Sequence, residues 1–258
     1  MRPGVLDKIR PFAMDALRLR FTAQASASYL GGNPTLPAQL DWPSRDGRPL
    51  TCLASFSLAE IAALDAVPWL PATGRLLFFY DVDEQPWGFD PADRGGWVVL
   101  RVDDAVPERI GAAEPLPKRF VRFERIESLP GWERCQALGI ALSDAETDEY
   151  IDASSELHGS EPLHQVSGYP SNVQDDSMEL QCQLASSGIW VGDPQAYDTP
   201  EARQLGPGAS EWRLLFQHEG DDDSDLMWGD CGSLFFWVKE SDARQGDFSN
   251  AWLVLQCS

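Results

Sequence analysis

Apolar segments occur along this chain in two sets that have the same internal order. In each set a short apolar segment comes first, a glycine-led aromatic segment follows, and a Trp-led segment comes last. The first set is Leu50–Phe56, residues 74–82 and residues 97–102, and the second is Trp212–Phe216, residues 232–239 and residues 252–257. Apolar and aromatic runs bounded by turn residues are typical of β-strands. We therefore predict a duplicated three-strand unit whose last two strands pair antiparallel.

Burial of these strands can be inferred from how continuous the apolar runs are. Leu76–Tyr80 contains no polar residue apart from its terminal tyrosine hydroxyl, and Leu234–Val238 is similar. A strand with one face in water alternates apolar and polar residues, whereas a continuous apolar run indicates burial on both faces. We expect both segments to be core strands.

Two helices are predicted. The segment Leu58–Leu64 has an apolar helical pattern, and it follows Ser57 with Glu60 three positions later, as in a capping box. An acid-rich helix is predicted over Asp144–Leu157, with Ser143 as its N-cap.

The organisation predicted from these patterns is a single domain. Glycines and prolines between Leu30 and Pro49 disfavour long regular structure there, and no low-complexity linker divides the chain. We predict one α+β, β-rich domain over residues 1–258 with a few helices, internally duplicated into sublobes of roughly 30–134 and 135–258.

Composition narrows the class of protein. The hydrophobic fraction of 43% and the charged fraction of 24% are those of a globular chain. The longest apolar runs are far shorter than the roughly 20 residues that cross a bilayer, and no signal-peptide pattern opens the chain, so we expect a cytoplasmic protein without membrane contact. The five cysteines form no C-x-x-C pair, and we expect reduced, mostly buried thiols.

Charge is distributed unevenly along the chain. The net charge is -21, and from Cys135 onward only Arg203, Arg213, Lys239 and Arg244 are basic. A deficit of cations argues against a nucleic-acid ligand, because phosphate contacts need them. The acidic second half instead favours a basic protein partner.

The acids of the second half fall into two groups, for which two interpretations stay open. On a helix, Asp144, Asp148 and Asp152 repel each other at i, i+4 spacing. Such a surface either keeps the protein soluble or docks a basic partner, with electrostatic steering of association. The candidate partner-binding residues are Asp144, Glu146, Asp148, Glu149, Asp152 and Glu156, in a run that continues to Glu161, and the loop Asp221, Asp222, Asp223 and Asp225.

Several motifs together resemble the YwqG-like bacterial family of unknown function. They are GGNPTLP at residues 31–37, DWP at 41–43, GRPL at 47–50, HQVSGYP at 164–170 and WGDCG at 228–232, followed by LFFW at 234–237. The resemblance implies a duplicated α+β fold and a cytoplasmic bacterial protein, and it brings no enzymatic activity. It also implies a context near toxin systems, in which related domains are suspected to be immunity proteins. The chain departs from the family pattern at residues 53–56 and at Cys231.

Six residues are candidates for lining a ligand pocket: His164, Gln165, Tyr169, Gln174, Trp228 and Asp230. His164 either lines a polar pocket or holds a loop by hydrogen bonds, and Asp230 either caps backbone N–H groups or faces a cleft. We expect Cys231 to be a buried thiol. The acidic loop beginning at Asp221 lacks the later ligands of an EF-hand, three histidines fit no zinc spacing, and nucleotide and hydrolase motifs are absent from the sequence. No metal, cofactor or catalytic residue is therefore predicted.

Two functions are compatible with these observations. The first is a non-enzymatic interaction protein, for example an immunity protein whose acidic half binds a basic toxin. The alternative is a ligand-binding or enzymatic domain with a cleft between the two repeats.

Overall fold

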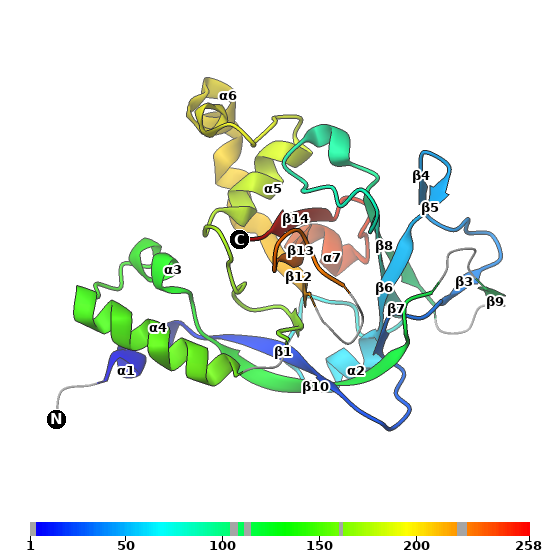
Figure 1. Cartoon of the computed structure of the whole chain (residues 1–258), viewed down its shortest axis with the longest axis horizontal. Coiled ribbons are helices and arrows are strands. Elements are labelled where there is room, and N and C mark those ends of the chain that lie inside the picture. The colour runs from blue at the N-terminus through cyan, green and yellow to red at the C-terminus, as the bar shows by residue number, and fades with distance from the viewer. Residues whose placement is uncertain (1–3, 104–107, 111–114, 160–161, 221–225) are drawn as a thin grey trace.

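The computed structural model describes residues 4–103, 108–110, 115–159, 162–220 and 226–258 (Figure 1). The elements in chain order are α1 (Val5–Ile9), η1 (Arg10–Phe12), β1 (Met14–Phe21), β2 (Tyr29–Leu30), β3 (Thr35–Pro37), β4 (Ser44–Arg45), β5 (Arg48–Pro49), β6 (Thr51–Ser57), α2 (Leu58–Ala62), β7 (Arg75–Tyr80), η2 (Pro91–Asp93), β8 (Trp97–Val102), β9 (Glu108–Ile110), β10 (Arg119–Ser128), α3 (Trp132–Ala137), α4 (Asp144–His158), β11 (Gln165–Val166), α5 (Met178–Ser186), η3 (Pro194–Asp198), α6 (Pro200–Leu205), η4 (Gly206–Glu211), β12 (Trp212–Glu219), β13 (Ser233–Lys239), α7 (Glu240–Gln245) and β14 (Trp252–Gln256).

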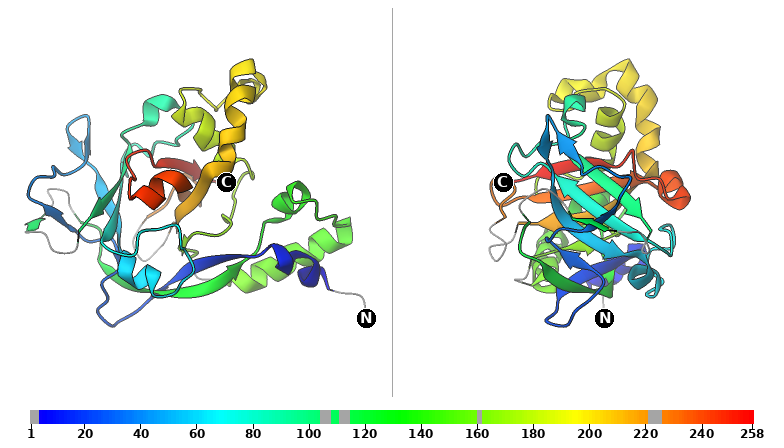
Figure 2. Two further views of the ribbon diagram at one scale, coloured as in Figure 1. Left: turned by 180° about the vertical axis from the view of Figure 1, so that it is seen from behind. Right: turned by 90° about the vertical axis from the view of Figure 1, so that its right-hand side faces the viewer.

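The fold is mixed, with one large antiparallel sheet and a few helices. The 10-stranded sheet has the order β14-β13-β12-β11-β1-β10-β2-β6-β7-β8. From either edge inward, the order is a three-strand meander, a two-residue strand and a long central strand. The sheet curls until it is nearly a barrel (Figure 2). The six predicted strands are confirmed as the two meanders, and their last two strands pair antiparallel as predicted.

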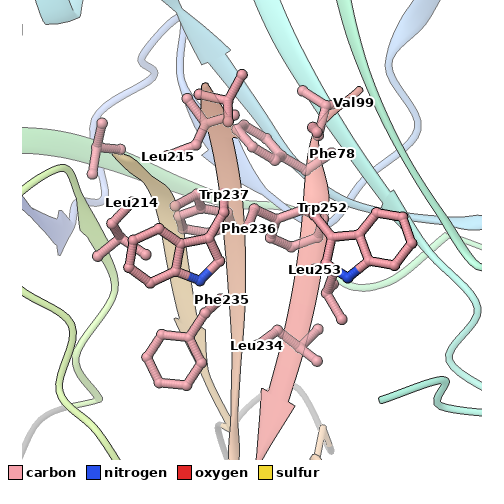
Figure 3. Packing of buried hydrophobic residues seen from close by; sticks show 14 of the residues in the cluster. Phe78, Val99, Leu214, Leu215, Leu234, Phe235, Phe236, Trp237, Trp252 and Leu253 are labelled. Atoms are coloured by element: carbon pink, nitrogen blue, oxygen red, sulfur yellow. The ribbon is translucent and has the colours of Figure 1, made fainter. Parts of the chain in front are cut away.

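The two meanders meet inside the curled sheet through aromatic side chains. Phe78 stands four residues after Gly74, and Phe236 stands four residues after Gly232; their ring centroids are 5.3 Å apart. Trp97 and Trp252, which begin β8 and β14, have centroids 5.0 Å apart. Figure 3 shows Phe78, Phe236 and Trp252 gathered between the strands. Residues at matching positions of the two sets therefore share one core.

Burial of β7 on both faces is confirmed. Leu76, Phe78 and Tyr80 belong to the main core, whereas Leu77 and Phe79 pack in a second cluster on the outer face. This second cluster is covered by the segment between β3 and β5, where Trp42 packs edge-on against Phe79 at 5.1 Å. The prediction that residues 30–49 lack long regular structure is also confirmed, because their strands span two or three residues each.

The loop between β7 and β8 covers the outer edge of β14. The amide of Leu255 donates to the carbonyl of Trp87 (3.0 Å). The indole N–H of Trp252 donates to the carbonyl of Gly88 (2.8 Å). An uncovered edge strand exposes unpaired backbone groups. This loop therefore covers an edge that the curled sheet leaves open and forms hydrogen bonds with it.

The long central strands β1 and β10 were not predicted. Leu17 and Leu19 of β1 are buried in the main core, and Arg18 and Arg20 alternate with them on the outer face. At one end the β1–β10 ribbon leaves the barrel and carries the arm, which we define as α1, α3 and α4 (Figure 1). The arm has a small core of its own, formed by Val5, Ile9, Cys135 and Tyr150.

The predicted caps have different outcomes. Ser143 caps α4 and forms a capping box with Glu146, as predicted. The capping box at α2 is wrong: the side chain of Ser57 makes no cap hydrogen bond. Glu60 instead accepts from the hydroxyl of Ser28 (2.6 Å) and the amide of Ala27 (3.2 Å). These donors reach Glu60 from a neighbouring segment, so its carboxylate ties that segment to α2.

Candidate functional site

A cavity of about 580 Å³ lies between the arm and the barrel. Its floor is the outer face of the β1–β10 ribbon, one wall is α3 and α4, and the other wall is the strap, which we define as residues 167–175 between β11 and α5. The lining residues are Arg18, Arg20, Ile126, Glu127, Ser128, Leu129, Gly131, Trp132, Glu133, Tyr150, Ile151, Ser154, Ser155, Leu163, Gln165, Tyr169, Pro170, Ser171, Asn172, Val173 and Gln174. Its volume is in the range of small-molecule sites.

Three buried glutamines hold the strap on the barrel. Gln165 donates to the carbonyls of Ser167 (2.7 Å) and Tyr169 (2.9 Å). The side-chain carbonyl oxygen of Gln217 accepts from the backbone amide of Ser171 (2.9 Å). Gln256 accepts from the amides of Val173 (2.9 Å) and Gln174 (3.1 Å), and it donates to the carbonyl of Asp175 (3.1 Å). Buried carboxamides need hydrogen-bond partners. These bonds supply the partners and hold the strap in one position on the barrel.

The start of the strap is pressed against the floor. Gly168 has a φ of +79°, and a Cβ built there would lie 2.7 Å from the side chains of Ala16 and Ser128. Only glycine permits this approach and this backbone conformation without strain. The next residue, Tyr169, donates its amide to the Ser128 hydroxyl (2.9 Å) and its phenol to the carbonyl of Phe12 (3.0 Å). Tyr169 is therefore bonded both to β10 and to η1.

An ion-pair cluster joins the arm to the strap and α5. The guanidinium of Arg134 on α3 donates to Asp176 (2.9 Å) and to Glu179 (2.8 Å). Burial alone would lower the pKa of Arg134, but the hydrogen bonds and charges of Asp176 and Glu179 outweigh it and raise that pKa. Asp176 also accepts from the amide nitrogen of Asn172 (3.0 Å). Both walls of the cavity are thus linked through Asp176.

The cavity mouth is apolar. Trp132 is 50% exposed, Ile151 42% and Val173 38%, and each of them lines the cavity. Close to this mouth, burial raises the pKa of Glu133, and the charges of Asp176 and Asp175 raise it further. An apolar mouth beside crowded carboxylates favours a ligand that is apolar where it enters and cationic around that point.

The six predicted pocket residues do not meet in one place. Gln165, Tyr169 and Gln174 line the cavity. His164 and Trp228 are instead buried inside the barrel, at 1% and 0% exposure. Asp230 is exposed in the turn before β13, and among the described residues its carboxylate has no hydrogen-bond partner.

His164 neighbours a second histidine in the barrel interior. Its ring lies 4.7 Å from that of His218 and 5.7 Å from Phe21. Among the described residues neither ring nitrogen of His164 has a hydrogen-bond partner. Burial lowers the pKa of His164 well below its usual value, and the nearby His218, Arg119 and Arg18 lower it further. Neither alternative proposed from the sequence describes it, because its ring packs in the core and makes no hydrogen bond among the described residues.

Trp228 and Cys231 belong to one turn and lie in opposite environments. The indole N–H of Trp228 donates to Nδ1 of His218 (3.1 Å), so Trp228 anchors this turn in the core. The expectation of a buried thiol at Cys231 is wrong, since Cys231 is exposed. It has a φ of +52°, so the chain reverses at this residue. The other four cysteines are free and buried, as expected.

The acidic helix α4 presents its carboxylates to solvent. Asp144, Asp148, Glu149, Asp152 and Glu156 are exposed. Glu146 differs, because it binds the ammonium of Lys8 and accepts from the amide of Ser143 (2.9 Å). Those contacts lower the pKa of Glu146 to about 2. The other predicted partner-binding acids, Asp221, Asp222, Asp223 and Asp225, lie outside the described residues, as does Glu161.

A comparison with protein families identifies the family of this chain. A domain of unknown function, DUF1963, matches residues 28–257. The chain belongs to the DUF1963 family. The matched part of this DUF1963 protein includes both meanders, β10, α3, α4 and the strap, and it begins after β1. The comparison with curated proteins gives no match.

Within the described ranges, no group of three or more His, Cys, Asp or Glu side chains in this DUF1963 protein is arranged to hold a metal ion. The helices of the same ranges include none with the length and hydropathy of a membrane span.

Proposed function

We propose that this DUF1963 protein is a non-enzymatic interaction protein that binds a basic protein partner through the acidic face of α4. The observation that carries the proposal is the set of exposed carboxylates at Asp144, Asp148, Glu149, Asp152 and Glu156. Within the described part of the chain, the single ion pair made by α4 is that of Glu146 with Lys8. The remaining carboxylates of α4 are therefore accessible to the cationic groups of a partner.

The position of α4 supports this role. The helix belongs to the arm, which projects from the barrel at one end of the β1–β10 ribbon (Figures 1 and 2). Like charges at i, i+4 on α4 destabilise the helix by a few tenths of a kcal/mol per pair, and a bound cation offsets this repulsion. A one-signed surface also steers an oppositely charged partner and raises its association rate.

The biological setting is part of the same proposal. The motifs shared with the YwqG-like family support a bacterial, cytoplasmic protein, and the context of that family supports an immunity role. A toxin that cleaves nucleic acid has a basic substrate groove, which is complementary to a row of carboxylates. We therefore propose such a toxin as the partner, with no nucleic acid or membrane contact by this chain itself.

The cavity supports binding over catalysis. Its described lining contains hydroxyls, carboxamides and carboxylates but no imidazole or thiol. The histidines at 164 and 218 are buried inside the barrel, and neither lines the cavity whose hydroxyls they would have to activate. A ligand site remains a second candidate function because the cavity has a suitable volume. Its place is then between arm and barrel, and not between the two meanders.

The internal duplication is also a proposal. It is supported by the strand order, which is the same from both edges of the sheet. It is also supported by the contact between Phe78 and Phe236 at matching positions. In this proposal the two halves begin earlier than the predicted bounds of roughly 30 and 135, because each starts with a long strand, β1 or β10. These two strands are exchanged: β1 pairs with β11 of the second half and β10 with β2 of the first.

The test is binding to products of neighbouring genes, with charge-reversed variants. Asp148→Lys combined with Asp152→Lys changes the exposed face of α4. Glu201→Lys combined with Glu211→Lys makes the same change of net charge outside the arm, at α6, which lies away from the arm (Figure 1), and at the end of η4. We expect the α4 pair to weaken binding at least tenfold, or about 1.4 kcal/mol, mainly through a slower association rate at low salt.

The control pair should leave affinity within about twofold, because its charges lie outside the docking face and exposed charges separated by more than a Debye length are largely screened. Circular dichroism of both variants establishes that the fold is kept. Equal affinities for the two variants would show that α4 is not the docking face. A failure of every neighbouring product to bind, or to be neutralised in co-expression, would refute the interaction role itself.

A further inference from the structure

Helix α4 is shared by the cavity and by the acidic face. Ile151 and Ser155 line the cavity. Asp148 precedes Ile151 by three residues, and Asp152 precedes Ser155 by three. Residues three or four apart on a helix lie on the same side. The two carboxylates are therefore placed beside the cavity mouth, within reach of groups that flank whatever enters it.

The cavity interior suits an apolar group more than a cation. Ile126, Leu129 and Leu163 contribute aliphatic surface to its lining, and the buried guanidinium of Arg18 belongs to its floor. An ammonium group placed against this aliphatic surface would lose its hydration. At the mouth the balance is reversed, because Asp148, Asp152 and Glu133 attract cations.

The length of the acidic row indicates what kind of ligand matches it. From Asp144 to Glu156 a helix rises about 18 Å at 1.5 Å per residue. An extended peptide of about five residues covers that distance at roughly 3.5 Å per residue. A small molecule that fills the cavity would leave most of the row without a counter-charge.

We infer that the cavity receives one apolar side chain of a basic peptide segment, whose flanking Lys or Arg residues pair with Asp148 and Asp152. This inference rests on the proposed function and specifies the docking position. Trp132, Ile151 and Val173 surround the apolar side chain at the mouth. The glutamine-held strap keeps that wall in place before binding, which limits the ordering cost of association.

The probes are fluorescein-labelled heptapeptides with lysines on both sides of a central Trp, Leu or Ala, measured by fluorescence anisotropy. A second series replaces the lysines by glycines. We expect the Trp and Leu peptides with lysines to bind about tenfold more tightly than the Ala peptide, because burial of an apolar side chain contributes at least that factor. The glycine series should bind at least tenfold more weakly.

Neutral variants separate the two contributions. Ile151→Gln with Val173→Gln changes the mouth, and Leu138→Gln with Met227→Gln makes the same exchange at exposed apolar residues outside the cavity lining. The first pair should abolish the preference for Trp and Leu over Ala, and the second should keep it. Asp148→Asn with Asp152→Asn should weaken all lysine peptides by a similar factor.

Each opposite result overturns the inference. Equal binding of the Ala and Leu peptides would show that the cavity takes no anchor, while the charge effect of Asp148 and Asp152, and with it the proposed function, would stand. Equal binding of the glycine and lysine series would show a neutral ligand site. Absence of binding by every peptide also refutes the inference. The proposed function is judged separately, on partner binding by the charge-reversed α4 variants.

Discussion

Gly88 offers a sharp test of how the curled sheet is closed. It lies in the loop that covers β14, with a φ of +80°, and a Cβ built on it would stand 1.8 Å from the carbonyl oxygen of Leu253. Gly47, in the turn between β4 and β5, has a φ of +77° and nothing within 4 Å of such a Cβ. Gly88→Ala and Gly47→Ala therefore impose the same backbone conformation on alanine, and only the first adds a clash.

The structure gives a magnitude for the difference. A left-handed conformation costs a non-glycine residue about 1–2 kcal/mol, which is the whole effect expected at Gly47. At Gly88 the loop must also retreat by about 1.6 Å to reach the 3.4 Å of ordinary contact. That retreat breaks the bonds from Leu255 to Trp87 and from Trp252 to Gly88. Each of the two buried donors left without a partner costs about 1–3 kcal/mol, so we expect a total of about 3–8 kcal/mol.

Urea unfolding followed by tryptophan fluorescence and by circular dichroism measures both variants against the parent chain. Coincident transitions by the two probes establish that a single free energy of unfolding applies. A difference between Gly88→Ala and Gly47→Ala of less than about 1 kcal/mol would refute the reasoning, because the loop could then leave β14 at little cost. Loss of soluble Gly88→Ala alongside soluble Gly47→Ala agrees with it.

Three further predictions concern the strap, the arm and the core histidine. Gln256→Met should destabilise the fold by about 2 kcal/mol and speed amide exchange at Val173 and Gln174, measured by hydrogen exchange with mass spectrometry, because their shared acceptor is lost. Arg134→Met should cost about 2 kcal/mol in urea unfolding, and Arg213→Met, whose pair with Glu240 is more exposed, less than about 1; equal costs would contradict the difference in burial. Because the pKa of His164 is lowered in the folded state, the unfolded chain binds the proton first, so stability should fall as pH drops below the ordinary value of 6.5. His164→Met should reduce the loss of unfolding free energy between pH 7 and pH 5. An unchanged dependence of that free energy on pH would show that His164 is not its source.

The parts of the fold that could be predicted from sequence are those in which one strong local pattern coincides with burial. Leu76–Tyr80 is apolar at every position, and both of its faces are covered. The strand can therefore be recognised without an alternation of apolar and polar residues. Strand β1 was missed although Leu17 and Leu19 alternate with Arg18 and Arg20, because the arginines give the segment the composition of a charged terminus. Alternation over four residues was the available signal.

The site could be predicted less well because its residues depend on distant contacts. Gln165, Gln217 and Gln256 are buried polar residues in strands of the sheet, and such residues are a signal that another segment crosses the sheet there. What crosses it is the strap, and sequence spacing gives no information about that. Glu60 fits a capping box by spacing, yet its carboxylate accepts a hydrogen bond from the hydroxyl of Ser28, which is distant in sequence.

The exchanged pairing of β1 and β10 has a consequence for how the chain acquires its structure. Strand β1 joins β10 through Met14 opposite Ser128, and it joins β11 through Leu17 opposite Val166. The core partner of Trp97 is Trp252 near the C-terminus. A chain emerging from the ribosome therefore holds its first half without the neighbours that complete it. Pairings of such long sequence separation slow folding, so the final structure can form only after the segment that contains Trp252 has been synthesised.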